Sequence, residues 1–154
     1  MLQFFLIYLY FVLNKKGIVM GQREIAIKMA RQAAENAYAP YSNFRVGATI
    51  RCGDKYFIGV NIENASYGLT ICAERVAIFS AIALGHKKID EIAVACIDAP
   101  DGAPANSLMP CGACRQVMAE FLDENAKIMI DRVGVFNMKE ILPVAFTLKC
   151  ESVD

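Results

Sequence analysis

The chain has 154 residues, enough for one domain with a sizeable core. Its 16 Lys and Arg residues balance 16 Asp and Glu residues, so no excess of positive charge favours binding to long nucleic acid. Six cysteines would suit a disulfide scaffold in an oxidising compartment. We instead expect a cytoplasmic protein in which Cys52, Cys96 and Cys150, which lie in mostly apolar stretches, are free thiols.

The first residues are unusual, because residues 2–13 are almost unbroken apolar sequence followed by Asn14-Lys15-Lys16. This run is too short to span a bilayer, which takes about 20 apolar residues, and no basic residue precedes it as in a secretory signal. We therefore expect residues 1–19 to be an extension outside the domain and Met20 to be the working start. Residues 20–154 would then form a single domain with no membrane partner. A membrane-tethering or packing role for the extension is the alternative.

Helix-like and strand-like patterns alternate along the rest of the chain. In chain order, we predict a helix over 22–38, a hairpin of strands over 46–51 and 56–61, a loop over 62–71, a helix from 72 to about 84, a strand over 91–97, a helix over 111–122, strands over 127–130 and 133–136, and a helical turn over 139–142. Strands alternating with helices after one hairpin predict an α/β fold with helices on both faces of the sheet.

Two short motifs at predicted helix starts carry the chemistry. Cys72-Ala73-Glu74-Arg75 offers a thiol and a carboxylate, and Pro110-Cys111-Gly112-Ala113-Cys114-Arg115-Gln116 offers two thiols three positions apart. A Cys-x-x-Cys pair alone is equally typical of a redox pair or of half a structural zinc site. The order of the motifs, the proline and the flanking arginines favour a catalytic zinc ion held by Cys72, Cys111 and Cys114, with the fourth coordination position open.

Glu74 stands beside a predicted ligand, so we interpret it as the proton carrier. Three thiolates and one Zn²⁺ sum to a charge of minus one, and we predict that Arg75 offsets this excess. The role of Arg115 is left open. The one histidine, His86, lies in a polar run after a predicted helix and is expected at the surface.

With three further stretches, these motifs make the chain similar to the cytidine deaminases of the small, homotetrameric, three-cysteine type. The stretches are Tyr38-Ala39-Pro40-Tyr41-Ser42-Asn43-Phe44-Arg45-Val46-Gly47-Ala48, Asn61-Ile62-Glu63-Asn64-Ala65-Ser66-Tyr67 and Leu142-Pro143-Val144-Ala145-Phe146. The resemblance covers roughly residues 22–148. It implies a three-layer α/β/α sandwich with a five-stranded mixed sheet, one Zn²⁺ per chain, and hydrolysis of cytidine and deoxycytidine to uridine and deoxyuridine with release of ammonia, a step of pyrimidine salvage.

The resemblance also implies roles for side chains outside the metal motifs. Phe44 would stack on the pyrimidine, and Asn61 and Glu63 would hold the ribose hydroxyls. Phe146 would close the site of a neighbouring subunit. The remaining substrate contacts would be Tyr67 and Ala73. Each role has a structural alternative, as a core aromatic, a polar loop residue or a packing residue. The segment over 131–139 looks shorter than the family pattern, which leaves the length of the last strand open.

Two other functions remain as alternatives. A deaminase of another cytosine-containing compound, such as blasticidin S, shares the cysteine motifs, but the ribose motif at Asn61 and Glu63 argues against it. A non-catalytic, zinc-stabilised module would leave Glu74 and the open metal position without a use. Release of ammonia from cytidine separates the enzymes from the module, whereas the sequence does not rank cytidine against deoxycytidine.

Overall fold

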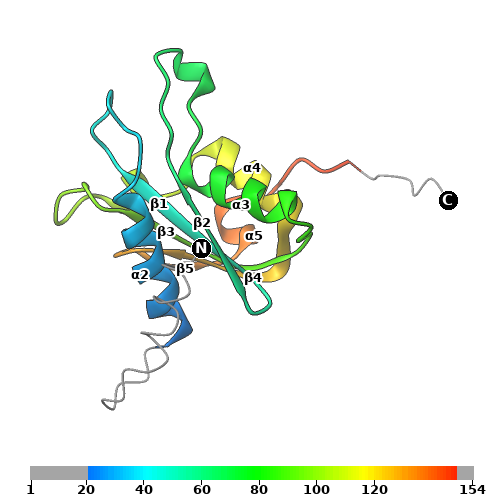
Figure 1. The fold of residues 1–154 in the computed structure, drawn as a ribbon. Helices are drawn as coiled ribbons and strands as arrows, with labels where there is room; N and C mark the ends of the chain where they lie inside the picture. Colours follow the sequence, from blue (N-terminus) through cyan, green and yellow to red (C-terminus); the bar gives the residue numbers. More distant parts are fainter. Residues whose placement is uncertain (1–20, 149–154) are drawn as a thin grey trace.

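The computed structural model describes residues 21–148, so the predictions for residues 1–19, Met20 and Cys150 concern residues outside it. The described chain forms a five-stranded mixed sheet between two layers of helices (Figure 1). Its elements are α2 (Gln22–Ala34), β1 (Val46–Cys52), β2 (Lys55–Val60), α3 (Ala73–Ala83), β3 (Ile89–Cys96), α4 (Gly112–Phe121), β4 (Leu122–Ile130), β5 (Gly134–Phe136) and α5 (Met138–Ile141). Within the described range, no helix is long and apolar enough to cross a membrane.

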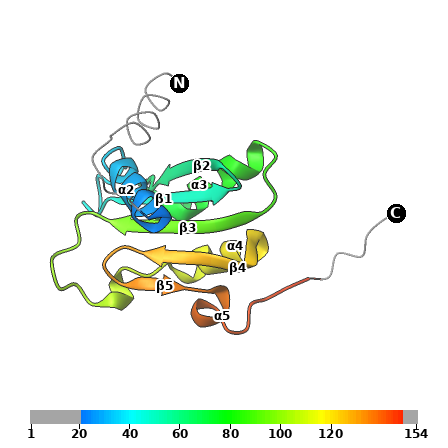
Figure 2. The same cartoon turned by 90° about the horizontal axis from the view of Figure 1, so that it is seen from below.

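The strand order is β2-β1-β3-β4-β5, with one parallel pair in the sheet. β1 pairs antiparallel with both β2 and β3, β4 pairs antiparallel with β5, and β3 and β4 run parallel. A parallel pair needs a crossover connection, and the segment that includes α4 provides it (Figure 2). The crossover leaves β3 at its carboxyl end, which is the end of a parallel sheet where functional groups commonly gather.

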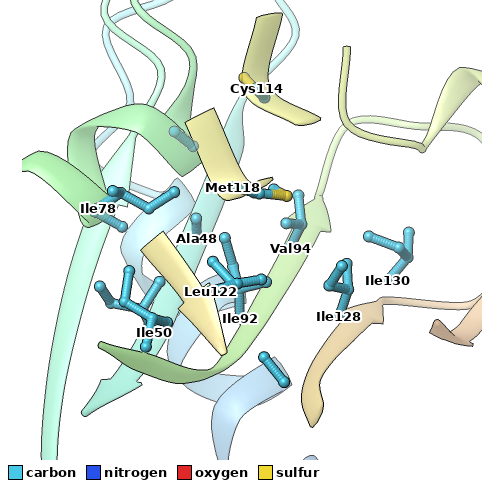
Figure 3. Packing of buried hydrophobic residues seen from close by; sticks show 14 of the residues in the cluster. Ala48, Ile50, Ile78, Ile92, Val94, Cys114, Met118, Leu122, Ile128 and Ile130 are labelled. Carbon is cyan, nitrogen blue, oxygen red and sulfur yellow. The ribbon is translucent and has the colours of Figure 1, made fainter. Parts of the chain in front are cut away.

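The two helix layers cover opposite faces because successive strand residues point to opposite sides. On β3, Ala93 and Ala95 pack against Ala26 and Ala30 of α2. The alternate residues of β3 belong to the larger core on the other face, beneath α3 and α4 (Figure 3). That core includes Ile50, Ile78, Ile92, Val94, Cys114, Met118, Ile128 and Ile130, all at most 2 % exposed. The predicted three-layer α/β/α sandwich is therefore confirmed.

Several boundaries differ from the sequence prediction. α2 ends at Ala34 rather than at residue 38, because the backbone of Tyr38 bonds instead to Asn61 and Glu63, at 3.0 and 2.8 Å. β4 starts directly after α4 at residue 122 and then departs from regular pairing before residue 127, where the prediction placed its start.

Two other expectations concern the last strand and the histidine. β5 has 3 residues, one fewer than the strand predicted over 133–136, and this gives the length that the sequence left open. His86 is only half exposed, since its ring packs against Phe57 with the ring centroids 5.0 Å apart.

Candidate metal and catalytic site

Three thiols converge where the first turns of α3 and α4 meet. Cys72 is the N-cap residue of α3, Cys111 is the N-cap residue of α4, and Cys114 lies fully buried in the first turn of α4. The Sγ of Cys111 lies 3.9 Å from that of Cys72 and 3.5 Å from that of Cys114, and all three lie within 4.8 Å of one another. Tetrahedral zinc with Zn–S bonds of about 2.3 Å separates its sulfur ligands by about 3.8 Å. The donor set therefore fits one zinc ion.

The local backbone explains why the sulfurs face each other. Cys72 and Cys111 both have extended φ and ψ angles, and neither thiol makes a side-chain capping bond to its own helix. Cys111 and Cys114 share one face of α4, because residues three apart are neighbours on a helix. Both helix N-termini point their partial positive charge at the cluster, which favours thiolates there.

The thiols differ in acidity. The pKa of Cys72 is lowered to about 5, chiefly because the Cys114 thiol donates to it and also because Arg75 does so. The pKa of Cys114 is raised, because it gives up that bond on ionising and because burial disfavours its thiolate. The three groups therefore do not all ionise on their own. Zinc that binds here must displace protons, which makes metal affinity dependent on pH.

Arg75 and Arg115 follow the ligands in sequence but make different contacts. Nη2 of Arg75 donates to the carbonyl of Thr70 at 3.2 Å and to Sγ of Cys72 at 3.7 Å. Arg115 donates to the carbonyls of Pro110 and Ile141, both at 2.8 Å, so it fixes backbone at the start of α4 and at the end of α5. Arg75 thus contacts the Cys72 sulfur, whereas Arg115, whose role the sequence left open, contacts only backbone carbonyls in these bonds.

Glu74 lies in the first turn of α3 and is 4 % exposed. Burial raises its pKa to about 6, and the neighbouring Cys72 thiolate acts in the same direction. A carboxyl with a pKa close to neutral can both accept and release protons at working pH. Ala73, between Glu74 and Cys72, is fully buried.

The side chain of Asn61, just after β2, holds the backbone near Phe44, just before β1. The Asn61 side chain accepts from the backbone N–H of Val46 at 2.8 Å and donates to the carbonyl of Phe44 at 2.9 Å. One amide hydrogen of Asn61 is left over from these two bonds. Phe44 is half-buried and packs against the main core. The asparagine predicted to hold ribose therefore also fixes the backbone that carries the predicted stacking ring.

Glu63 holds the loop that precedes Phe44. Its carboxylate accepts from the backbone N–H groups of Tyr41 and Ser42, at 2.9 and 3.2 Å, and from the Ser42 hydroxyl. The hydroxyl bond, with help from the two backbone bonds, lowers the pKa of Glu63. Sequence reasoning missed this use of Ser42, since a lone serine in a loop gives no signal of its partner.

Two predicted substrate residues are exposed in the single chain. Tyr67 is 76 % exposed and its ring meets the edge of Tyr41, with centroids 6.1 Å apart. Phe146 is 68 % exposed, and its carbonyl accepts from the side chain of Gln116 on α4 at 2.8 Å. Gln116 ends the second cysteine motif, but the sequence indicated no role for it; its bond ties the segment after α5 to the helix that carries two of the thiols.

Comparison with known proteins identifies the family. Residues 20–130 match the family model of the cytidine and deoxycytidylate deaminase zinc-binding region. The chain belongs to this deaminase family. The cytidine deaminase of Halalkalibacterium halodurans is 46 % identical over 130 residues, which are 81 % of this chain and 94 % of that protein. The cytidine deaminase of Mycobacterium tuberculosis is 40 % identical over 121 residues, covering 77 % and 85 %.

A crystal structure gives the same result. The cytidine deaminase from Burkholderia pseudomallei superposes with a TM-score of 0.72 at 42 % identity, over 82 % of this chain and all of that one. The predicted deaminase resemblance and its α/β fold are therefore confirmed. A zinc ion is the cofactor of this deaminase domain, and the three-thiol cluster can hold one.

Proposed function

We propose that this protein is a zinc-dependent cytidine deaminase that converts cytidine and deoxycytidine to uridine and deoxyuridine with release of ammonia. The observation that carries the proposal is the buried Glu74 carboxyl two residues from Cys72, in a cluster of three thiols with zinc-like spacing. The relatives described above are cytidine deaminases, so neither blasticidin S as substrate nor a non-catalytic module is favoured.

The chemistry follows from one carboxyl that acts twice. Cys72, Cys111 and Cys114 would hold Zn²⁺, which would supply Lewis acidity towards a water molecule at the open position. Glu74 accepts a proton from the attacking water and gives it to ring N3, which makes C4 electrophilic. After the water oxygen has added to C4, Glu74 moves the second proton to the amino group, which leaves as ammonia. Arg75 offsets the excess negative charge of the thiolates.

The substrate contacts are proposed from the same geometry. Phe44 stacks on the base, and the spare amide hydrogen of Asn61 and the ionised Glu63 hold the ribose hydroxyls. The bond between Asn61 and the Phe44 carbonyl supports this grouping, since it ties the Asn61 side chain to the backbone that carries the Phe44 ring. Tyr67 and Ala73 supply the remaining proposed substrate contacts, Ala73 through its place in the first turn of α3.

We further propose a homotetramer in which Phe146 closes the site of a neighbouring subunit. Large apolar side chains that are exposed in the single chain support an interface. They include Tyr38 57 %, Tyr67 76 %, Leu69 64 % and Phe146 68 %. Sedimentation at several concentrations tests the assembly. A stable monomer with full activity would contradict it.

The domain and the compartment belong to the same proposal. Residues 20–154 are the catalytic unit, which agrees with a family match that starts at residue 20. The cytoplasm suits the enzyme because its three metal-binding thiols must stay reduced.

The function is tested by incubating zinc-loaded protein with cytidine and following the loss of cytosine absorbance together with ammonia. We expect both signals with cytidine and deoxycytidine and not with blasticidin S. Removal of the metal by a chelator should stop both, and added Zn²⁺ should restore them. Zinc-loaded protein that releases no ammonia from either nucleoside would refute the proposal.

A further inference from the structure

Gly59 lies in β2, opposite Ala48 of β1, at the point where α3 rests on the sheet. A Cβ at this position would lie 2.9 Å from the Cα of Ala77, and closer still to the N of Ala77 and to the carbonyl oxygen of Ala73. All three neighbours are backbone atoms, so no side chain can rotate away to make room. The first turn of α3 therefore sits directly on the bare backbone of β2.

The same turn carries site residues. Ala73 stands between Cys72, a predicted zinc ligand, and Glu74, the predicted proton carrier. Ala73, Ala77 and Ala81 are fully buried and share one face of α3, being four residues apart. The other two thiols belong to α4. The distance between the sulfurs of Cys72 and Cys111 therefore depends on how closely α3 approaches the sheet.

We propose that Gly59 is a positioning residue for the metal site. Its missing side chain sets the height of the first turn of α3 and hence the places of the Cys72 sulfur and the Glu74 carboxyl. The proposal builds on the proposed function, although its metal readouts need no turnover. A methyl group at this position would lie too close to the backbone of α3, inside the 3.4 Å at which ordinary contact begins by several tenths of an ångström or more. Metal sites tolerate about 0.2 Å in ligand distance, and a 1 Å misplacement can cost about 10²-fold in rate.

Gly47 provides a matched control on the opposite face of the sheet. A Cβ there would lie 2.6 Å from the backbone N of Ala34 and closer still to the carbonyl oxygen of Ala30, both in α2. None of the predicted site residues lies on α2. Gly47→Ala thus forces a helix away from the sheet just as Gly59→Ala does, but leaves the helices of the thiols in place.

The experiment compares full-length parent, Gly59→Ala and Gly47→Ala. Zinc affinity is measured by competition with a chromophoric chelator, and Co²⁺-loaded protein reports ligand geometry through its visible absorption bands. We expect both variants to unfold at lower temperature. Gly59→Ala should raise the zinc Kd at least tenfold, shift the cobalt bands and lower kcat/KM for cytidine about 10²-fold. Gly47→Ala should keep the zinc Kd within threefold and the parent cobalt spectrum.

The proposal is overturned if Gly59→Ala binds zinc like the parent, or if Gly47→Ala weakens zinc binding equally. Should Gly59→Ala aggregate, Ala77→Ser adds one oxygen on the same buried face and is read in the same assays. A folded Ala77→Ser protein with parent zinc affinity and parent cobalt bands would overturn the proposal too. A parent protein that binds no zinc would instead refute the proposed function.

Discussion

Replacing Glu74 with glutamine separates proton transfer from the cost of burying a charge. The carboxyl is 4 % exposed, and burial raises its pKa from the ordinary 4.5 to about 6. Each unit of difference in pKa corresponds to about 1.4 kcal/mol, so the ionised carboxylate destabilises the metal-free fold by about 2 kcal/mol. Glutamine has nearly the same shape but never ionises. We therefore expect Glu74→Gln to lower turnover by about 10²–10⁴-fold, the usual contribution of a general acid–base group. The metal-free variant should at the same time be more stable than the metal-free parent.

The sign of the effect on stability depends on pH. Below pH 4.5 the carboxyl is neutral in both the folded and the unfolded chain, so parent and variant should unfold at the same denaturant concentration. Between pH 4.5 and 6 the unfolded chain ionises first, and the parent loses stability relative to the variant. Above pH 6 the full difference should be present. Bound zinc should reduce it, because a nearby cation favours the carboxylate.

The assay is denaturant unfolding of chelator-treated parent and variant protein, followed by circular dichroism at pH 4.5, 6 and 7.5. Turnover and zinc content are measured on zinc-loaded samples of the same preparations. A variant that is less stable than the parent at pH 7.5, or a difference that does not change with pH, would refute burial as the cause of the raised pKa. Turnover within tenfold of the parent, with zinc bound, would show that another group moves the protons.

Three further outcomes are expected. Arg75→Gln should keep zinc at neutral pH but move the acidic limb of the profile of kcat/KM against pH to higher pH, because a more negative site holds its protons more tightly. An acidic limb that does not move would limit Arg75 to a structural role. Asp98 accepts three bonds from Arg45, at 2.6 to 2.9 Å, and these lower its pKa from 3.8 to about 2. Above pH 3.8, Asp98→Asn should therefore lower the free energy of unfolding by about 1 kcal/mol, allowing for solvent screening. The resulting difference in denaturation midpoint should shrink as the pH falls towards 2, and a difference that stays constant with pH would contradict this. Deleting residues 1–19 should leave activity and oligomeric state unchanged in matched assays, and a truncated chain that fails to fold would make that segment structural.

The metal motifs could be predicted because their chemistry is local in sequence. Ligand types, their spacing and the helix starts all lie within a few residues, and the three thiols do converge as expected. The bonds that orient the surrounding residues join distant positions and leave no local pattern. Ser42 bonds to Glu63 across 21 residues, and Arg115 reaches Ile141 across 26.

Backbone details escaped prediction for a similar reason. The helical pattern of α2 continues past Ala34, but the bonds of Tyr38 to a distant loop outweigh it. The amide of Asn61 is largely taken up by Val46 and Phe44, a use that its polar loop setting did not indicate. The close contact of α3 with Gly59 depends on how the helix and β2 approach each other in space. In the sequence, a glycine in a strand indicates only that some backbone comes close.

The separation of the sulfur ligands along the chain bears on how the protein acquires its metal. Cys72 and Cys111 lie 39 residues apart, and all of β3 lies between them. A nascent chain therefore cannot assemble the ligand set until β3 and the start of α4 have left the ribosome. Because the separated ligands of the unfolded chain offer no preformed site, the free energy of zinc binding adds to the stability of the folded protein. Zinc limitation in a cell would then lower the amount of this protein through degradation, and not only its activity.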